Sequence, residues 1–160
     1  MTLKQKIDRE LNRLMSEWAE GKTQRLDLET DSGRLACEIT AVDALACSFD
    51  TIDFVSEQTA DASIGQLREM AESLSVKLGY LLEPLDVIEV DEQWRIVQLR
   101  SRPPHRDDES IGYYELEIRP GQSRLRRYEK HPERPREAIP ITVTREVFGR
   151  LAEDLCSVVS

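Results

Sequence analysis

The chain has 160 residues, of which 39% are hydrophobic and 33% are charged, and its formal net charge is −9. This length fits one domain, so we expect a single domain over residues 1–160. No segment approaches the ~18 consecutive apolar residues of a membrane helix, and the mixed-charge N-terminus has no secretory signal. We therefore expect a cytoplasmic protein that does not bind membranes, and the acidic balance makes nucleic acid an unfavourable partner.

Charge is unevenly spread along the chain. Thirteen acids and two bases lie between Cys37 and Trp94, whereas eleven bases and seven acids lie between Arg95 and Arg136. A folded protein with one acidic and one arginine-rich region is polarised, and polarity of this kind steers partners.

The first predicted elements are a helix and a meander of three strands. Thr2 and Gln5 have the spacing of a capping box, and Gly21 offers a stop after the apolar stripe. That stripe consists of Leu3, Ile7, Leu11, Leu14 and Trp18. The strands are expected at residues 24–30, 34–41 and 45–55.

The register of this meander follows from its alternating apolar residues. Leu45, Cys47 and Phe49 alternate with polar residues, which predicts that all three face the core. A short loop at residues 42–44 would place Ile39 opposite Cys47 and Cys37 opposite Phe49.

The second half repeats a helix followed by strands. Ser63 and Gln66 have capping-box spacing, and the helix that they start should end before Pro84. Strands are expected at residues 85–91, 93–102, 111–119 and 123–130, then a proline-rich loop at 131–140. Thr144 caps the last helix.

These elements predict an α+β fold with the order αβββαββββα. Consecutive meanders favour a mostly antiparallel sheet of about seven strands, with three helices on one face. In element order, size and acidity the chain resembles type III secretion chaperones, over residues 3–55 and 64–81. The resemblance implies a chaperone-like fold. The arginine-rich hairpin and the proline loop depart from it.

The hairpin of residues 111–130 pairs acids with arginines. If Pro120 and Gly121 form the tip, Glu117 faces Arg124 and Glu115 faces Arg126; a four-residue loop would instead pair Glu117 with Arg126. In both registers these side chains lie opposite the face of Tyr114, Leu116 and Ile118. Cross-strand pairs of opposite charge stabilise a solvated sheet face by ~0.2–1 kcal/mol each, so structure alone can explain them.

Other bases in this region lack nearby acids in the sequence; they are Arg100, Arg102, Arg106, Arg127, Lys130, Arg134 and Arg136. Arginine suits carboxylates and phosphates, so Arg100, Arg102, Arg124 and Arg126 are candidate ligands for an anion. Tyr113 and Tyr128 share their predicted face, as a nucleic-acid surface would require. The chain carries no nucleic-acid-binding signature, and its net charge opposes that function.

Metal, cofactor and nucleophile motifs are weak or absent. His105 with Asp107 and Asp108 lies in a proline-flanked loop, and the acids Asp50, Asp53 and 89–92 have no ligand spacing, so we expect no metal site. Cys37, Cys47 and Cys156 fall on or beside core positions, where burial makes thiols unreactive. No cofactor is expected, because no phosphate loop or dinucleotide fingerprint occurs.

Two functional hypotheses follow. The first is a non-enzymatic protein-interaction domain, adaptor or chaperone-like, that binds a protein partner or associates with itself through its polarised charge. The alternative is a domain, enzymatic or not, that binds an anionic or phosphate ligand on an arginine-rich sheet face.

Overall fold

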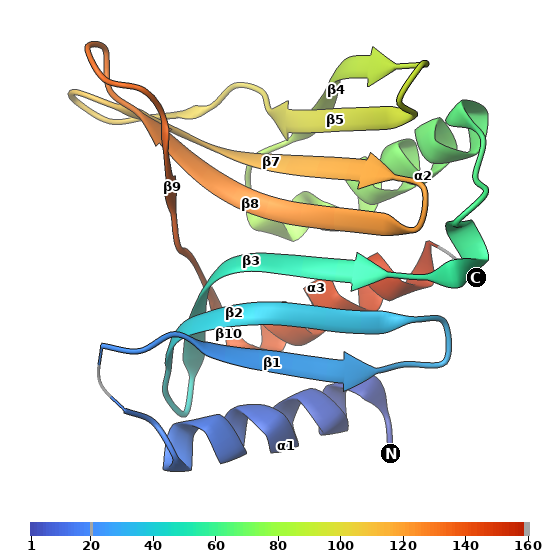
Figure 1. Ribbon diagram of the computed structural model, residues 1–160. Helices are drawn as coiled ribbons and strands as arrows, with labels where there is room; N and C mark the ends of the chain where they lie inside the picture. The colour runs from blue at the N-terminus through green and yellow to red at the C-terminus, as the bar shows by residue number, and fades with distance from the viewer. Residues whose placement is uncertain (20, 159–160) are drawn as a thin grey trace.

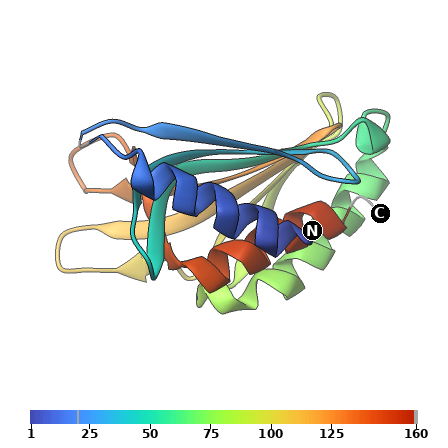
Figure 2. The same ribbon diagram turned by 90° about the horizontal axis from the view of Figure 1, so that it is seen from below.

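The chain forms two layers, a sheet and a layer of helices. The computed structural model describes residues 1–19 and 21–158, so residues 20, 159 and 160 of the predicted domain lie outside the description. Over the described part, three α-helices cover one face of a ten-stranded antiparallel sheet, as Figures 1 and 2 show. The predicted α+β class is confirmed. Among the described residues no helix is long and apolar enough to cross a membrane.

Local capping starts each helix at the predicted residue. Thr2 and Ser63 form capping boxes with Gln5 and Gln66 at the starts of α1 (Leu3–Ser16) and α2 (Ile64–Lys77). The Thr144 hydroxyl accepts from the amide of Val147 at the start of α3 (Arg145–Ser157). Two short 3₁₀ helices are η1 (Glu57–Thr59) and η2 (Leu78–Leu81).

The main sheet runs in the order β1-β2-β3-β8-β7-β5-β4. Its strands are β1 (Gln24–Glu29), β2 (Arg34–Val42), β3 (Ala46–Val55), β4 (Leu85–Asp91), β5 (Ile96–Ser101), β7 (Ile111–Arg119) and β8 (Gln122–Lys130). Three shorter strands add to it: β6 (His105–Arg106) pairs with β7, β9 (Glu137–Ile139) with β8, and β10 (Ile141–Thr144) with β3.

The sheet divides between β3 and β8. Residues 52–55 of β3 pair with residues 122–125 of β8, and the two strands separate beyond Ile52 and Leu125. Beyond that point β10 pairs with residues 46–49 of β3, and β9 pairs with residues 127–129 of β8. In Figure 1, β9 crosses the space between the diverging strands. We call this division the fork.

The predicted loop at residues 131–140 is therefore wrong in its second half. Residues 137–139 and 141–144 are strands because the fork leaves one edge of β8 and one edge of β3 unpaired. Residues 137–139 form hydrogen bonds with the free backbone groups of β8, and residues 141–144 with those of β3. Pro140, which has no N–H to donate, separates the two strands. With β6, these strands raise the expected seven to ten over the described residues, so four predicted strands after α2 become seven.

The predicted register of β2 and β3 is also wrong. The paired residues are shifted along the strands, but Cys37 and Ile39 still face the core. Cys37 lies opposite Ile52 and Ile39 opposite Phe49, with irregularities on either side of Ile39. Leu45 lies in the turn and is 80% exposed, because the Asp43 carboxylate accepts from the amides of Leu45 and Ala46 and tightens that turn.

The core lies between the sheet and the three helices. Phe49 of β3 meets Phe148 of α3 edge to face, with ring centroids 5.3 Å apart. Buried residues from every helix join it, including Leu11 of α1 and Leu74 of α2. The helices therefore cover one face only and leave the opposite face of the sheet open (Figure 2).

One end of the sheet is closed by contacts between its turns. The Ser56 hydroxyl donates to the carbonyl of Ser32 over 2.5 Å, and the Ser56 amide donates to the carbonyl of Gly121 over 2.9 Å. Gly33 lies in the same place: a Cβ there would be 2.2 Å from the carbonyl oxygen of Val55. The β1–β2 turn is thus pressed against the end of β3.

We predict that Gly33→Ala destabilises the protein by about 1–3 kcal/mol, because the added methyl group displaces backbone in a packed turn. Urea unfolding followed by circular dichroism measures the loss. Gly79→Ala is the matched control, since nothing lies within 4 Å of a Cβ at Gly79. Equal unfolding midpoints for the two variants would contradict the close packing at Gly33.

Candidate functional site

The open face of the sheet carries most of the predicted site residues. The β7–β8 register matches a two-residue turn: Glu117 lies opposite Arg124 and Glu115 opposite Arg126. Because side chains alternate along a strand, the residues at every second position of the hairpin share this face, while Leu116, Ile118 and Leu125 enter the core. The first of the two predicted registers is confirmed.

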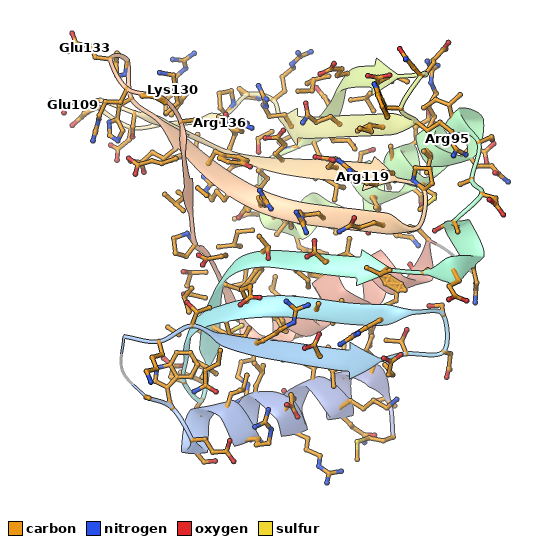
Figure 3. The ribbon with its side chains drawn as sticks, viewed as in Figure 1. Arg95, Glu109, Arg119, Lys130, Glu133 and Arg136 are labelled. Carbon is orange, nitrogen blue, oxygen red and sulfur yellow. The ribbon has the colours of Figure 1, made fainter. Side chains whose placement is uncertain are left out.

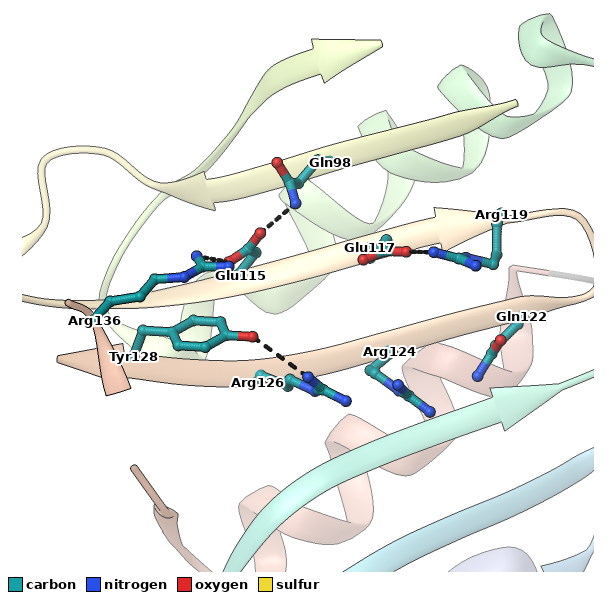
Figure 4. Close-up of a pocket in the computed structure, with 9 residues that line it drawn as sticks. All are labelled: Gln98, Glu115, Glu117, Arg119, Gln122, Arg124, Arg126, Tyr128 and Arg136. Carbon is teal, nitrogen blue, oxygen red and sulfur yellow. Dashed lines mark hydrogen bonds and ion pairs between the residues drawn. The ribbon is translucent and has the colours of Figure 1, made fainter. Parts of the chain in front are cut away.

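A hollow of about 280 Å³ lies on this face. Figure 4 shows the side chains that line it, and Figure 3 shows Arg119 and Arg136 at opposite ends of the β7–β8 hairpin. The lining residues come from three strands and from the residue before β9: Gln98, Glu115, Glu117, Arg119, Gln122, Arg124, Arg126, Tyr128 and Arg136.

Glu115 is the buried charge of this hollow, with only 6% of its surface exposed. Its carboxylate accepts from the side-chain amide of Gln98 and from Arg136, whose Nη1 lies 2.5 Å from Oε2. Arg100 approaches the other oxygen, 3.8 Å from Oε1. A carboxylate that is nearly removed from water needs such donors, and these three supply them.

Arg136 reaches over the sheet from the segment that precedes β9. Its guanidinium lies 3.8 Å from the centroid of the Tyr128 ring and donates to the Tyr113 hydroxyl over 3.3 Å. Burial opposes its charge, but the hydrogen bonds to Tyr113 and Glu115 outweigh burial and raise the pKa of Arg136. Arg100 lies in a similar way over Tyr113, at 4.7 Å. The two tyrosines therefore hold the cations that neutralise Glu115.

Two further arginines of the hollow have carboxylate partners. Arg124 donates to Asp53 of β3 through Nε at 2.5 Å and Nη2 at 3.2 Å, and the hydrogen bond to Asp53 raises its pKa. Arg119 forms an ion pair with Glu117, two residues before it on β7.

Arg126 differs from its neighbours. No carboxylate of the described residues lies within ion-pair distance of it, and its Nη1 donates to the Tyr128 hydroxyl over 3.5 Å. Its Nε is buried without a hydrogen-bond partner, as is that of Arg100, whose guanidinium lies near Glu115. No residue of β3 pairs with Arg126, because the pairing ends at Ile52 and Leu125. Glu115, which lies opposite Arg126 on β7, is bound by Gln98, Arg100 and Arg136 instead.

The structure brings together some of the predicted site residues and separates one. Arg124 and Arg126 line the hollow, and Arg100 borders it through Glu115. Arg102 follows the end of β5, is exposed, and does not line the hollow. Arg100 and Arg102 would share a face if β5 continued, but the strand ends at Ser101. The Arg102 side chain therefore has no neighbouring strand to pack against.

Several lining residues were missed in the sequence. Gln98 shares a face with Arg100 by alternation, and this signal could have found it. Arg136 stood out in the sequence only as an arginine without a nearby acid, because its position depends on β9 pairing with β8, a contact between a segment rich in proline and an unpaired strand edge.

The other sequence candidates do not assemble into a site. Within residues 1–19 and 21–158, no three His, Cys, Asp or Glu side chains come together as a metal ion would require. Cys37, Cys47 and Cys156 are all buried and reduced. Burial raises the pKa of Cys47 to about 12 and that of Cys156 to about 11, and it also raises the pKa of Cys37.

A scan of the chain against protein-family models finds no match, and searches of curated proteins and of solved structures find none either. The resemblance to type III secretion chaperones stays a prediction from element order.

We predict that Arg136→Met lowers the free energy of unfolding by about 1–2 kcal/mol, because it takes a charged donor from a nearly buried carboxylate. Chemical unfolding measures this loss. Arg134→Met is the control, since that exposed side chain has no partner among the described residues. Adding Glu115→Gln to Arg136→Met should recover part of the loss. Additive effects of the two substitutions would show that the pair does not interact.

We predict that the three thiols react slowly in the native protein near pH 8, about the pKa of a free thiol, and rapidly in denaturant. The unfolded thiols ionise above that pH while the folded ones stay neutral. The stability from burial is therefore complete below about pH 8.5 and is lost as pH rises toward the folded values. As the pH rises, the free energy of unfolding should fall more for the wild type than for Cys47→Ala, as urea unfolding at several pH values would measure. Parallel losses would contradict the raised pKa of Cys47.

Proposed function

We propose that this protein is a non-enzymatic interaction domain that receives a protein partner on the open face of its sheet. The observation that carries the proposal is Arg126, a cation without a carboxylate at the centre of a face whose other arginines are paired. An uncompensated charge in a hollow among compensated ones is a natural contact point for an acidic side chain of a partner.

The paired charges around Arg126 support a binding role. Asp53, Glu115 and Glu117 hold their arginines in place, so the surface is ordered before a partner arrives. Binding to an ordered surface costs less conformational entropy than binding to mobile side chains. The surface also stands on a hydrogen-bonded sheet rather than on a loop.

Some acids of the acidic segment and some arginines of the basic segment form ion pairs with each other within the molecule. Asp53 of the acidic segment binds Arg124 of the basic segment, and Glu83 binds Arg127 over 3.1 Å. These charges are therefore not left to attract a second copy, and the open face favours a different protein as the partner over self-association.

A random-peptide library selected on the immobilised protein tests this function. We expect enriched peptides that carry Asp or Glu at a shared position, since a single unpaired arginine anchors a single acid. Amide chemical-shift changes on binding should fall on β5, β7 and β8, the strands that line the hollow. Selection of peptides without acids, or shifts confined to the helices, would overturn the proposal.

A further inference from the structure

One arginine that lines the hollow has no carboxylate partner. Arg119, Arg124 and Arg136 each have a carboxylate partner, in Glu117, Asp53 and Glu115. Arg126, the fourth arginine of the lining, has none among the described residues. With Arg100 and Asp53, which contact the lining, five arginines face three carboxylates, so the site attracts anions. Glu115 and Glu117 line the same hollow, so the additional charge of a phosphate would lie near two carboxylates.

The donors at this position suit two oxygens on one atom. Arg126 presents a planar guanidinium, and the Tyr128 hydroxyl lies two residues further along the same face, 3.5 Å from Nη1. Figure 4 shows both groups inside the hollow, with the Tyr128 hydroxyl directed at the guanidinium. A carboxylate can accept from the guanidinium through both oxygens, and the hydroxyl can donate to one of them.

The free protein leaves Arg126 incompletely bonded. Its Nε is buried and makes no hydrogen bond, and an unpaired buried donor raises the free energy of the state that contains it. A ligand that turns the guanidinium and engages Nε removes this cost, which adds to the affinity for the ligand. Arg124, whose Nε already donates to Asp53, offers no such gain.

We propose that Arg126 and Tyr128 form a binding site for a single carboxylate group. This inference rests on the proposed function in one respect only, namely that the carboxylate belongs to an acidic side chain of the partner protein. The site itself requires nothing beyond the hollow, its surplus charge and the unpaired guanidinium.

Titration with sodium acetate at constant ionic strength tests the site, followed through the arginine Nε–H signals in nitrogen-15 correlation spectra. We expect a saturable shift of the Arg126 signal. Sodium phosphate and sodium chloride are the comparison arms. Tighter binding of phosphate than of acetate would overturn the assignment to a carboxylate, and the absence of a saturable shift at Arg126 would overturn the site.

Substitutions then locate the donors. Arg126→Gln should weaken acetate binding by at least about tenfold, the effect of losing a hydrogen bond from a charged donor. Tyr128→Phe, which keeps the ring beneath Arg136, should weaken it less, and Arg126→Lys should not restore it, because an ammonium group lacks the planar fork.

Arg102→Gln is the matched control, since it removes the same charge outside the hollow and should leave acetate binding unchanged. Equal weakening by Arg102→Gln and Arg126→Gln would show that only overall charge matters. If the Gln variant fails to fold, the Arg126 signal of the wild type and the Lys variant still decide. If acetate binds but the library yields no enriched peptide, the proposed function is refuted and the carboxylate site stands. If acidic peptides are enriched but acetate does not bind, the carboxylate site alone is refuted.

Discussion

The edge of β3 that faces β8 has to serve two partners. β8 stays hydrogen-bonded to it at residues 52–55 only, and β10 takes residues 46–49. Beyond residues 52 and 125 the β7–β8 hairpin diverges from β3. The strands β9 and β10 occupy the resulting space, and this arrangement brings Arg136 over the sheet.

The electrostatics of the open face depend on the same division. Where β3 is paired with β8, Asp53 neutralises Arg124; where the strands have separated, Arg126 has no equivalent. Glu115, which faces Arg126 across the hairpin, is bound by Gln98, Arg100 and Arg136 instead. The binding of Glu115 by Arg136, which β9 places over the sheet, thus leaves Arg126 without the carboxylate that faces it.

Local features were predictable from sequence. Thr2, Ser63 and Thr144 start their helices because each cap involves residues within one turn, and the Pro120-Gly121 tip set the hairpin register in the same local way. The alternation of charge on that hairpin correctly placed Arg124 and Arg126 on one open face.

Features that depend on distant pairing were not predictable. β9 (Glu-Ala-Ile) has little strand propensity of its own and forms because it meets an unpaired edge of β8. β10 (Ile-Thr-Val-Thr) consists of β-branched residues typical of strands, but its partner β3 lies far away in the sequence. Leu45 was expected in the core, but the bonds from its own and the following amide to Asp43 place it in a turn. The role of Arg136 follows from β9, and Arg126 lacks a carboxylate because Arg136 binds Glu115, so neither can be derived from neighbouring residues.

The late position of β10 in the chain has a consequence for biosynthesis. Residues 46–49 of β3 are made early, and their strand partner at 141–144 is made after all the other strands described here. Until that segment leaves the ribosome, the nascent chain carries an unpaired strand edge next to the apolar side chains of Cys47 and Phe49. Such an edge can pair with other chains. The protein thus depends on its last strand to protect an edge that has been exposed through most of its synthesis.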